Sequence, residues 1–90
     1  MKTAHLTIRG RVQGVGYRAF LCREAQRHGV AGWVRNRSDG SVEAVLQGSP
    51  EAVQSVIDQA HRGPRGGHVT NVEVSEAEGV FTGFEQRPTE

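Results

Sequence analysis

The chain opens on an alternation of apolar and polar positions that changes to a helical period near residue 17. Leu6, Ile8 and Val12 are separated by polar residues, which is the pattern of a half-buried strand. From Tyr17 onward, apolar positions recur every three or four residues and predict a helix. One stripe of that helix comprises Tyr17, Phe20, Leu21, Ala25 and His28. Gly29 follows as the C-terminal stop of the helix.

The middle of the chain repeats the succession of strand and helix. Residues 30–37 are expected to form a second strand, and Ser38-Asp39-Gly40-Ser41 carries the Asp-Gly signal of a tight hairpin. Alternation at 42–46 predicts the third strand. Ser49-Pro50-Glu51 predicts a helix start, with serine as the N-cap and proline in the first turn. The apolar face of that helix is made by Val53, Val56, Ile57 and Ala60. Gly63-Pro64 ends it.

A fourth strand is expected around Val72 and Val74, and residues 81–86 offer a short fifth. The order βαββαβ is that of the ferredoxin-like sandwich, an α+β fold. We therefore expect residues 1–90 to form a single domain with a mainly antiparallel sheet in the order 4-1-3-2. The two helices should cover one face of the sheet.

Composition narrows the class of protein. A hydrophobic fraction of 36% is typical of a soluble globular domain. Because the formal net charge is only +1, any anion-binding site must come from a local group of residues. Cys22 is the sole cysteine, so it excludes an intrachain disulfide, and no partner is apparent that would activate its thiol. No apolar run reaches a membrane span or a signal peptide. A cytoplasmic monomer that binds neither membrane nor nucleic acid is the default expectation.

The turn between the first strand and the first helix, Gln13-Gly14-Val15-Gly16-Tyr17-Arg18, is the first candidate site. Its two glycines allow a sharp turn that points backbone N–H groups inward, and the helix start adds positive partial charge. Arg18 places a cation where the helix dipole favours an acid. A bound anion would neutralise both the charge of Arg18 and the positive partial charge of the helix start. The simpler interpretation is a glycine-rich turn with a surface arginine.

The segment Gly14–Ala19 also satisfies the dinucleotide-binding pattern G-x-G-x-x-G/A. That pattern requires a parallel βαβ unit and an acidic residue about 20 positions later. Arg35, Asn36 and Arg37 stand there instead, and the chain is short for a doubly wound domain. These requirements disfavour a Rossmann domain.

Asn36 is the second candidate. Strand alternation places it on the same face as Val34 and opposite to Trp33 and Arg35. In a ferredoxin-like sheet the first two strands are parallel with the third between them, so their C-terminal ends share one edge. Asn36 should then lie two strand spacings, roughly 9–10 Å, from the glycine turn. An asparagine at a strand end is otherwise a common turn former.

Several catalytic groups have no obvious counterpart in the chain. No carboxylate pair, Ser-His-Asp arrangement or lysine-bearing phosphate loop is evident, and the four histidines lack the spacing of metal ligands. One arginine, one asparagine and backbone amides can stabilise a phosphoryl group and hold a water in line. Such a site can catalyse hydrolysis when the leaving group departs without taking up a proton. A carboxylate bonded to phosphorus in a mixed anhydride is a leaving group of this kind.

Two stretches carry a specific family resemblance. Gly10-Arg11-Val12-Gln13-Gly14-Val15-Gly16-Tyr17-Arg18 resembles the first signature of the acylphosphatase family. Gly32-Trp33-Val34-Arg35-Asn36, followed by Gly40, Val42 and Gly48, resembles the second. The resemblance extends over nearly the whole chain in length and in the order of elements.

The resemblance implies hydrolysis of acyl phosphates to a carboxylate and inorganic phosphate, without a metal or an organic cofactor. It implies that Arg18 binds the phosphate, that Asn36 orients the attacking water, and that the backbone of residues 13–17 forms the cradle. The substrate itself can accept the proton of the water. Arg37 and the Gln86–Glu90 tail depart from the usual pattern, which bears on substrate access or stability.

Two other classes of function fit the sequence less well. An RNA-binding domain on this fold would need stacking aromatic residues on the central strands, and Ile8, Arg9, Arg11, Glu43 and Val45 supply none. A catalytically silent ligand-sensing module of a larger carbamoyl-phosphate-handling enzyme is disfavoured by the intact Arg18 and Asn36. The physiological substrate is left open, because the motifs address only the acyl-phosphate group.

Overall fold

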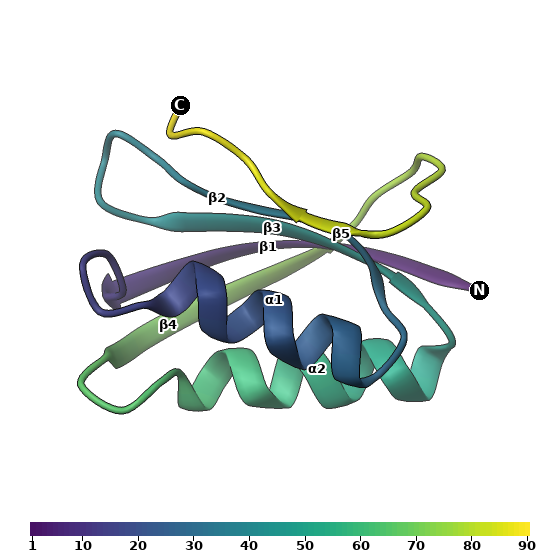
Figure 1. Cartoon of the computed structure of the whole chain (residues 1–90), viewed down its shortest axis with the longest axis horizontal. Helices are drawn as coiled ribbons and strands as arrows, with labels where there is room; N and C mark the ends of the chain where they lie inside the picture. The colour runs from purple at the N-terminus through teal and green to yellow at the C-terminus, as the bar shows by residue number, and fades with distance from the viewer.

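The computed structural model describes all of residues 1–90 as one sheet with two helices (Figure 1). In chain order the elements are β1 (Lys2–Arg11), α1 (Tyr17–Arg27), β2 (Ala31–Asn36), β3 (Val42–Gly48), α2 (Pro50–Arg62), β4 (His68–Glu76) and β5 (Phe84–Gln86). The βαββαβ order expected from the hydrophobic pattern is confirmed, and the short fifth strand is present.

The sheet has the order β4-β1-β3-β2-β5. The first four strands pair antiparallel in the predicted 4-1-3-2 order, and only β5 runs parallel to its neighbour β2. Because β1 and β2 both run antiparallel to β3, they are parallel to each other and end at the same edge. The glycine turn after β1 and the end of β2 are thereby brought to one end of the molecule.

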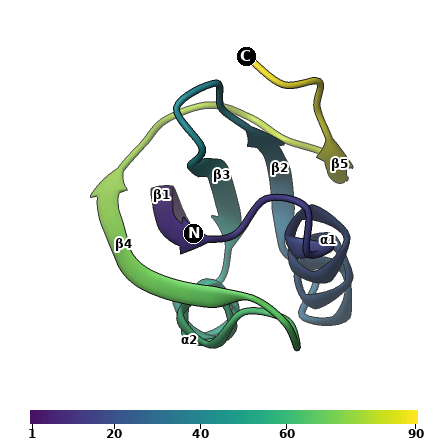
Figure 2. The same cartoon turned by 90° about the vertical axis from the view of Figure 1, so that its left-hand side faces the viewer.

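Both helices cover the same face of the sheet, as Figure 2 shows in end view. The core lies between that face and the apolar stripes of the helices. It comprises Ala4, Leu6, Ile8, Val12, Tyr17, Leu21, Ala25, Val30, Val34, Val42, Ala44, Leu46, Val53, Val56, Ile57 and Ala60. The predicted N-cap of α2 is also present, since the backbone N–H of Ala52 donates to the Ser49 hydroxyl at 3.1 Å.

One local expectation was wrong. Helix α1 ends at Arg27, one residue before His28, so His28 is exposed and does not extend the apolar stripe. All seven residues of the predicted third strand, β3, are buried, including the polar Glu43 and Gln47. The segment from residue 77 to 83 crosses the face opposite the helices (Figure 2), and Gln47 donates to the carbonyl of Gly79 at 2.7 Å.

The C-terminal segment continues beyond β5 along β2. The backbone N–H of Arg87 donates to the carbonyl of Val34 at 2.8 Å, and that of Glu90 donates to the carbonyl of Asn36 at 3.1 Å. Strand β2 is therefore covered along its outer edge by the end of the chain. No helix is both long and apolar enough to cross a bilayer.

Candidate active site

The turn between β1 and α1 is shaped by two left-handed glycines. Gly14 has a φ of 74°, and Gly16, the N-cap residue of α1, has a φ of 79°. A Cβ at either position would meet nothing within 4 Å, so glycine is required there by backbone conformation and not by space. This conformation curls residues 13–17 around the N-terminus of the helix.

The amides of this turn have no acceptor within the protein. No backbone N–H from Gly14 to Ala19 donates to another backbone group or to a side chain. The N-cap makes no side-chain bond, and the first turn of α1 carries no acidic residue. Six adjacent donors at a helix N-terminus form a site for an anion.

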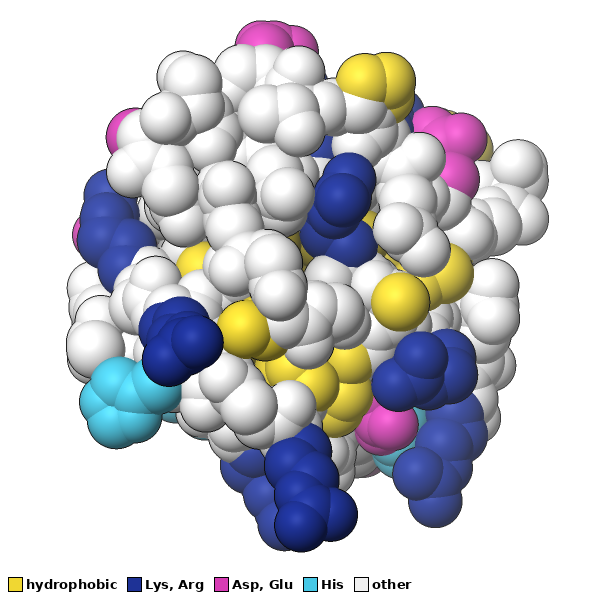
Figure 3. Space-filling model, turned by 60° about the vertical axis from the view of Figure 1, so that its left-hand side comes forward, with side chains coloured by type: hydrophobic (Ala, Val, Ile, Leu, Met, Phe, Trp, Pro, Cys, Tyr) yellow, Lys and Arg dark blue, Asp and Glu magenta, His cyan; other side chains and the backbone are white.

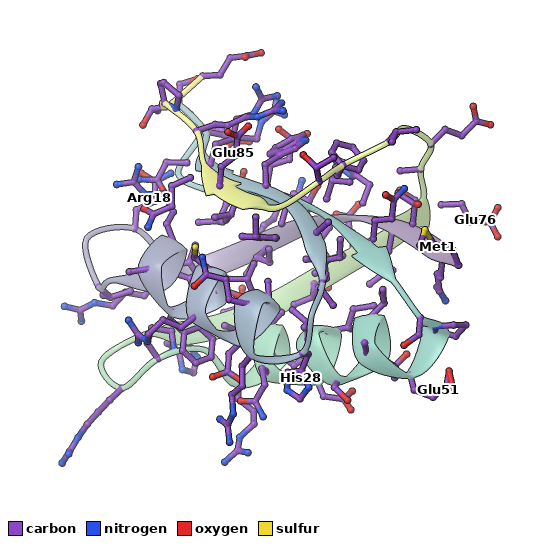
Figure 4. All side chains as sticks on the ribbon, turned by 45° about the vertical axis from the view of Figure 1, so that its right-hand side comes forward. Met1, Arg18, His28, Glu51, Glu76 and Glu85 are labelled. Carbon is purple, nitrogen blue, oxygen red and sulfur yellow. The ribbon has the colours of Figure 1, made fainter.

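Arg18 lies in the first turn of α1 and is half-buried. It makes no hydrogen bond or ion pair with any protein group. All eight ion pairs in the molecule use other arginines or histidines. Figure 4 shows its side chain projecting from the start of α1 toward the edge of the sheet that carries β5. The guanidinium is therefore available to a ligand at the turn.

Asn36 is the last residue of β2 and faces the helices, as its alternation with Val34 predicts. Its side-chain oxygen Oδ1 is buried and has no hydrogen-bond partner in the protein. A buried amide oxygen without a partner is costly, so this atom is suited to hold a water or a substrate group.

One cavity of about 150 Å³ joins these groups. It is lined by Val12, Gly14, Gly16, Tyr17, Arg18, Ala19, Asn36 and Gln86. The structure thus brings the glycine turn, Arg18 and Asn36 together at the shared end of β1 and β2. A volume of this size accommodates a phosphoryl group and a water, with the remainder of a substrate outside.

Three of the residues expected in the cradle direct their side chains elsewhere. Gln13 and Val15 do not line the cavity, and Val15 packs partly against the core. The hydroxyl of Tyr17 is buried and donates to the carbonyl of Ala60 at 2.7 Å. These residues can contribute to a ligand site only through their backbone.

Gln86 lines the cavity, although the sequence pointed to it only as the first residue of the C-terminal tail. It belongs to β5 and lies opposite Val34 of β2, which places its exposed side chain at the mouth of the cavity. The alternation at residues 81–86 indicated a strand but carried no information on its neighbour. The contribution of Gln86 could therefore be found only from the pairing of β5 with β2.

Positive side chains predominate at this end of the molecule (Figure 3). Arg11 ends β1, Arg18 is the second residue of α1, and Arg65 lies between α2 and β4. With a formal net charge of only +1 for the chain, the positive charge is concentrated where an anion would enter.

A network of charged residues occupies the opposite face of the sheet. Glu43 of β3 bonds Arg35 at 2.7 Å, His5 at 2.6 Å and Arg37 at 3.1 Å. Burial alone would raise the pKa of Glu43, but the hydrogen bonds from His5 and Arg35 outweigh it and hold that pKa below its ordinary value. Arg37 is thereby engaged away from the cavity. No group of three or more His, Cys, Asp or Glu side chains is arranged to hold a metal ion.

The model of the family described as acylphosphatase matches residues 4–86. The chain belongs to the acylphosphatase family. An acylphosphatase from Thiobacillus denitrificans is 59% identical over 87 residues, which cover 97% of this chain and 98% of the relative. An acylphosphatase from Thermococcus kodakarensis is 57% identical over 79 residues, covering 86% and 87% of the two chains. This chain is thus an acylphosphatase enzyme, and the resemblance carried by its two signatures is confirmed.

The fold of the family is equally well matched. The crystal structure of acylphosphatase from Bacillus subtilis superposes with a TM-score of 0.93 at 36% identity, covering 97% of this chain and 99% of that chain. The acylphosphatase from Coxiella burnetii gives a TM-score of 0.92 at 31% identity, covering 96% and 92%. The α+β ferredoxin-like architecture expected from the sequence is therefore that of known acylphosphatases.

Proposed function

We propose that residues 1–90 act as a single domain that hydrolyses acyl phosphates, with the phosphoryl group held in the 150 Å³ cavity between the glycine turn and Asn36. One observation carries the proposal. Five of the six residues whose backbone amides are unpaired, the unpaired Arg18 among them, line one cavity together with Asn36, whose buried Oδ1 is also unpaired. Donors and charge suit a phosphoryl group, and the amide oxygen suits a water.

The turn binds the phosphoryl oxygens. The amides of residues 14–19 donate to them, and the start of α1 adds a favourable partial charge. Arg18 contributes a full positive charge and a planar pair of donors that can engage two oxygens at once. These interactions strengthen as the reaction develops charge on the phosphoryl group.

Asn36 orients the attacking water. Its Oδ1 accepts a hydrogen bond from the water, whose oxygen then attacks phosphorus in line with the acyl oxygen. The bond between phosphorus and the acyl oxygen breaks, and the carboxylate leaves with the electron pair. One proton of the water passes to a phosphoryl oxygen, so that the products are a carboxylate and inorganic phosphate.

This mechanism uses groups of one chain only. A carboxylate is a good leaving group without protonation, and the phosphoryl group accepts the proton of the water, so neither a general acid nor a general base is needed. The proposed steps use no metal ion and no organic cofactor. Because the turn, Arg18 and Asn36 come from the same chain, the site is complete in a monomer.

Replacing the two side chains separately tests the assignment of roles. Arg18→Gln should weaken phosphate binding by about 1.5–3 kcal/mol and lower kcat/KM by at least as much, since the charge acts in ground and transition states. Arg18→Lys should recover only part of this loss. Asn36→Ala should remove most turnover while phosphate still binds. Turnover of one acyl phosphate and a phosphate titration measure both.

Matched controls are available outside the cavity. Arg23→Gln and Asn71→Ala make similar changes at exposed positions that do not line it, and both should keep wild-type turnover. Inorganic phosphate should inhibit competitively, and so should sulfate. Wild-type turnover in both Arg18→Gln and Asn36→Ala would show that the site is elsewhere. Equal loss of phosphate affinity in the two variants would show that their roles are not divided.

A further inference from the structure

The side-chain amide of Gln13 links the two halves of the site. Its Nε2 donates to the carbonyl oxygen of Arg37 at 2.7 Å and to that of Ser41 at 2.8 Å. Both acceptors are carbonyl oxygens, which fixes the orientation of the amide and uses both of its N–H groups. Gln13 directly precedes Gly14, and Arg37 directly follows Asn36. The two bonds therefore join the residue before the turn to the residue after Asn36.

The two carbonyl acceptors belong to a hairpin that is held by several hydrogen bonds of its own. The backbone N–H of Arg37 donates to the carbonyl of Ser41 at 2.8 Å, and that of Gly40 donates to the carbonyl of Arg37 at 3.1 Å. The carboxylate of Asp39 accepts from the Ser41 backbone N–H at 2.9 Å and from its hydroxyl at 2.6 Å. Gln13 is thus bonded to a hairpin whose backbone geometry is fixed by its own hydrogen bonds.

Nothing else in the hydrogen-bond network holds the turn to β2. The last pair of β1 with β3 is Ile8 with Val42, and beyond it β1 pairs only with β4. Apart from the two bonds of Gln13, no hydrogen bond joins residues 12–19 to residues 36–42. Beyond the shared core packing of Val12, Tyr17, Val34 and Val42, the separation of the phosphoryl group from the water-binding oxygen of Asn36 is therefore set by the hydrogen bonds of this one side chain.

We propose that Gln13 is a positioning residue for the hydrolysis, an inference that rests on the proposed function of Arg18 and Asn36. It does not line the cavity and therefore does not act as a catalytic group. It sets the distance and angle between the bound phosphoryl group and the water held by Asn36. A misplacement of about 1 Å in such a geometry can cost a factor of about 100 in rate.

The proposal predicts a split between binding and turnover. The six amides of the turn and Arg18 stay in register with one another when the turn shifts as a unit, because all belong to one continuous segment. Loss of the Gln13 bonds should therefore leave the phosphate Kd within about threefold, while kcat falls by roughly 10- to 100-fold. A purely structural role would lower stability without this split.

Gln13→Met, which keeps the length of the side chain and removes its donors, is the direct test. Gln47→Met is the matched control, because Gln47 also donates from Nε2 to two oxygens, those of Thr3 and Gly79, and lies outside the cavity. The control should lose stability and keep both kcat and the phosphate Kd. Gln13→Lys retains hydrogen-bond donors at a similar distance from the backbone, so its kcat should be substantially higher than that of Gln13→Met. If Gln13→Met does not fold, Gln13→Lys serves as the test in its place.

The outcomes separate this proposal from the one on which it rests. Wild-type kcat in Gln13→Met, alongside inactive Asn36→Ala and Arg18→Gln, would overturn the role of Gln13 alone. Equal losses of kcat and phosphate affinity would place Gln13 in binding and overturn it too. If Gln13→Met unfolds, a Gln13→Lys variant that folds and has no better kcat than Asn36→Ala would also overturn it. Wild-type turnover in Asn36→Ala and Arg18→Gln would overturn the proposed site itself.

Discussion

The hydroxyl of Tyr17 donates a hydrogen bond to the carbonyl oxygen of Ala60 at 2.7 Å. In an α-helix this carbonyl would accept from the residue four positions later, which here is Pro64 and has no N–H. Tyr17 supplies the missing donor near the end of α2. Because Tyr17 is also the first residue of α1, the bond fixes the start of that helix, and with it the glycine turn, to the rest of the core.

Tyr17→Phe should therefore destabilise the protein without removing phosphate binding. The buried carbonyl of Ala60 loses its partner, which costs about 1–3 kcal/mol in the free energy of unfolding. The backbone amide of residue 17 is retained, so the phosphate Kd should change little. Urea unfolding and a phosphate titration measure the two quantities. If Tyr17→Phe leaves the urea midpoint of unfolding unchanged, the Ala60 carbonyl does not depend on this hydroxyl for a hydrogen-bond partner.

The same bond predicts a pH dependence at the alkaline end. Burial raises the pKa of Tyr17 well above its ordinary value of 10.0. A raised pKa means that the contribution to stability is complete below pH 10 and is lost as the pH rises through the folded pKa. Tyr17 is the sole tyrosine, so tyrosinate absorbance reports on it alone. That absorbance should be absent in the folded protein at pH 10 and appear together with unfolding. Ionisation near pH 10 without unfolding would contradict the burial of the hydroxyl.

The end of the chain should support Asn36. The backbone N–H of Glu90 donates to the carbonyl of Asn36 at 3.1 Å, and the N–H of Ser38 donates to the carbonyl of Glu90 at 2.8 Å. Deleting residues 88–90 removes both bonds and should cost about 1–3 kcal/mol in the free energy of unfolding. It should also lower kcat more than phosphate affinity, since Asn36 is loosened and the glycine turn is not.

Glu90→Ala is the matched control for this deletion. It keeps the backbone bonds and removes only the ion pair of Glu90 with Arg35, at 2.5 Å, in which Glu90 is largely exposed. An exposed pair contributes about 0–1 kcal/mol, so this variant should be close to wild type in stability and in kcat. A deletion no worse than Glu90→Ala would show that the backbone bonds of the tail do not hold Asn36.

Glu43 should give the protein an acid-sensitive stability. Its pKa is held below the ordinary 4.5, so its contribution is complete above that pH and is lost as the pH falls through the folded pKa. Glu43→Gln should cost about 1–3 kcal/mol at pH 7, because Arg35 and Arg37 lose a buried partner. The difference from wild type should shrink below pH 4.5, as measured by urea unfolding across pH. A constant difference down to the acid transition would refute the role of its charge.

Local sequence signals were sufficient for the elements and for most of the fold. Alternation at Leu6 and Ile8 indicated a strand, the Asp-Gly dipeptide a hairpin, and Ser49 a helix N-cap, because each depends on residues close in sequence. The strand order followed from the succession of elements, since few topologies suit βαββαβ. The same parity argument placed Asn36 on the helix side of β2. The boundary at His28 failed because the end of a helix depends on what packs around it.

The sequence by itself determined which chemical groups this protein has at one end of its sheet: a turn with two glycines before a helix start, an arginine in the first turn of that helix, and an asparagine ending the next strand. Those properties arise from neighbouring residues and from the regular geometry of strands. Only the tertiary structure decided that β5 pairs with β2 and brings Gln86 to the cavity, that Gln13 bonds Arg37 and Ser41, and that Glu90 reaches Asn36. Each of these contacts joins segments at least 24 residues apart, and its partner depends on how the whole chain packs, which no local pattern encodes.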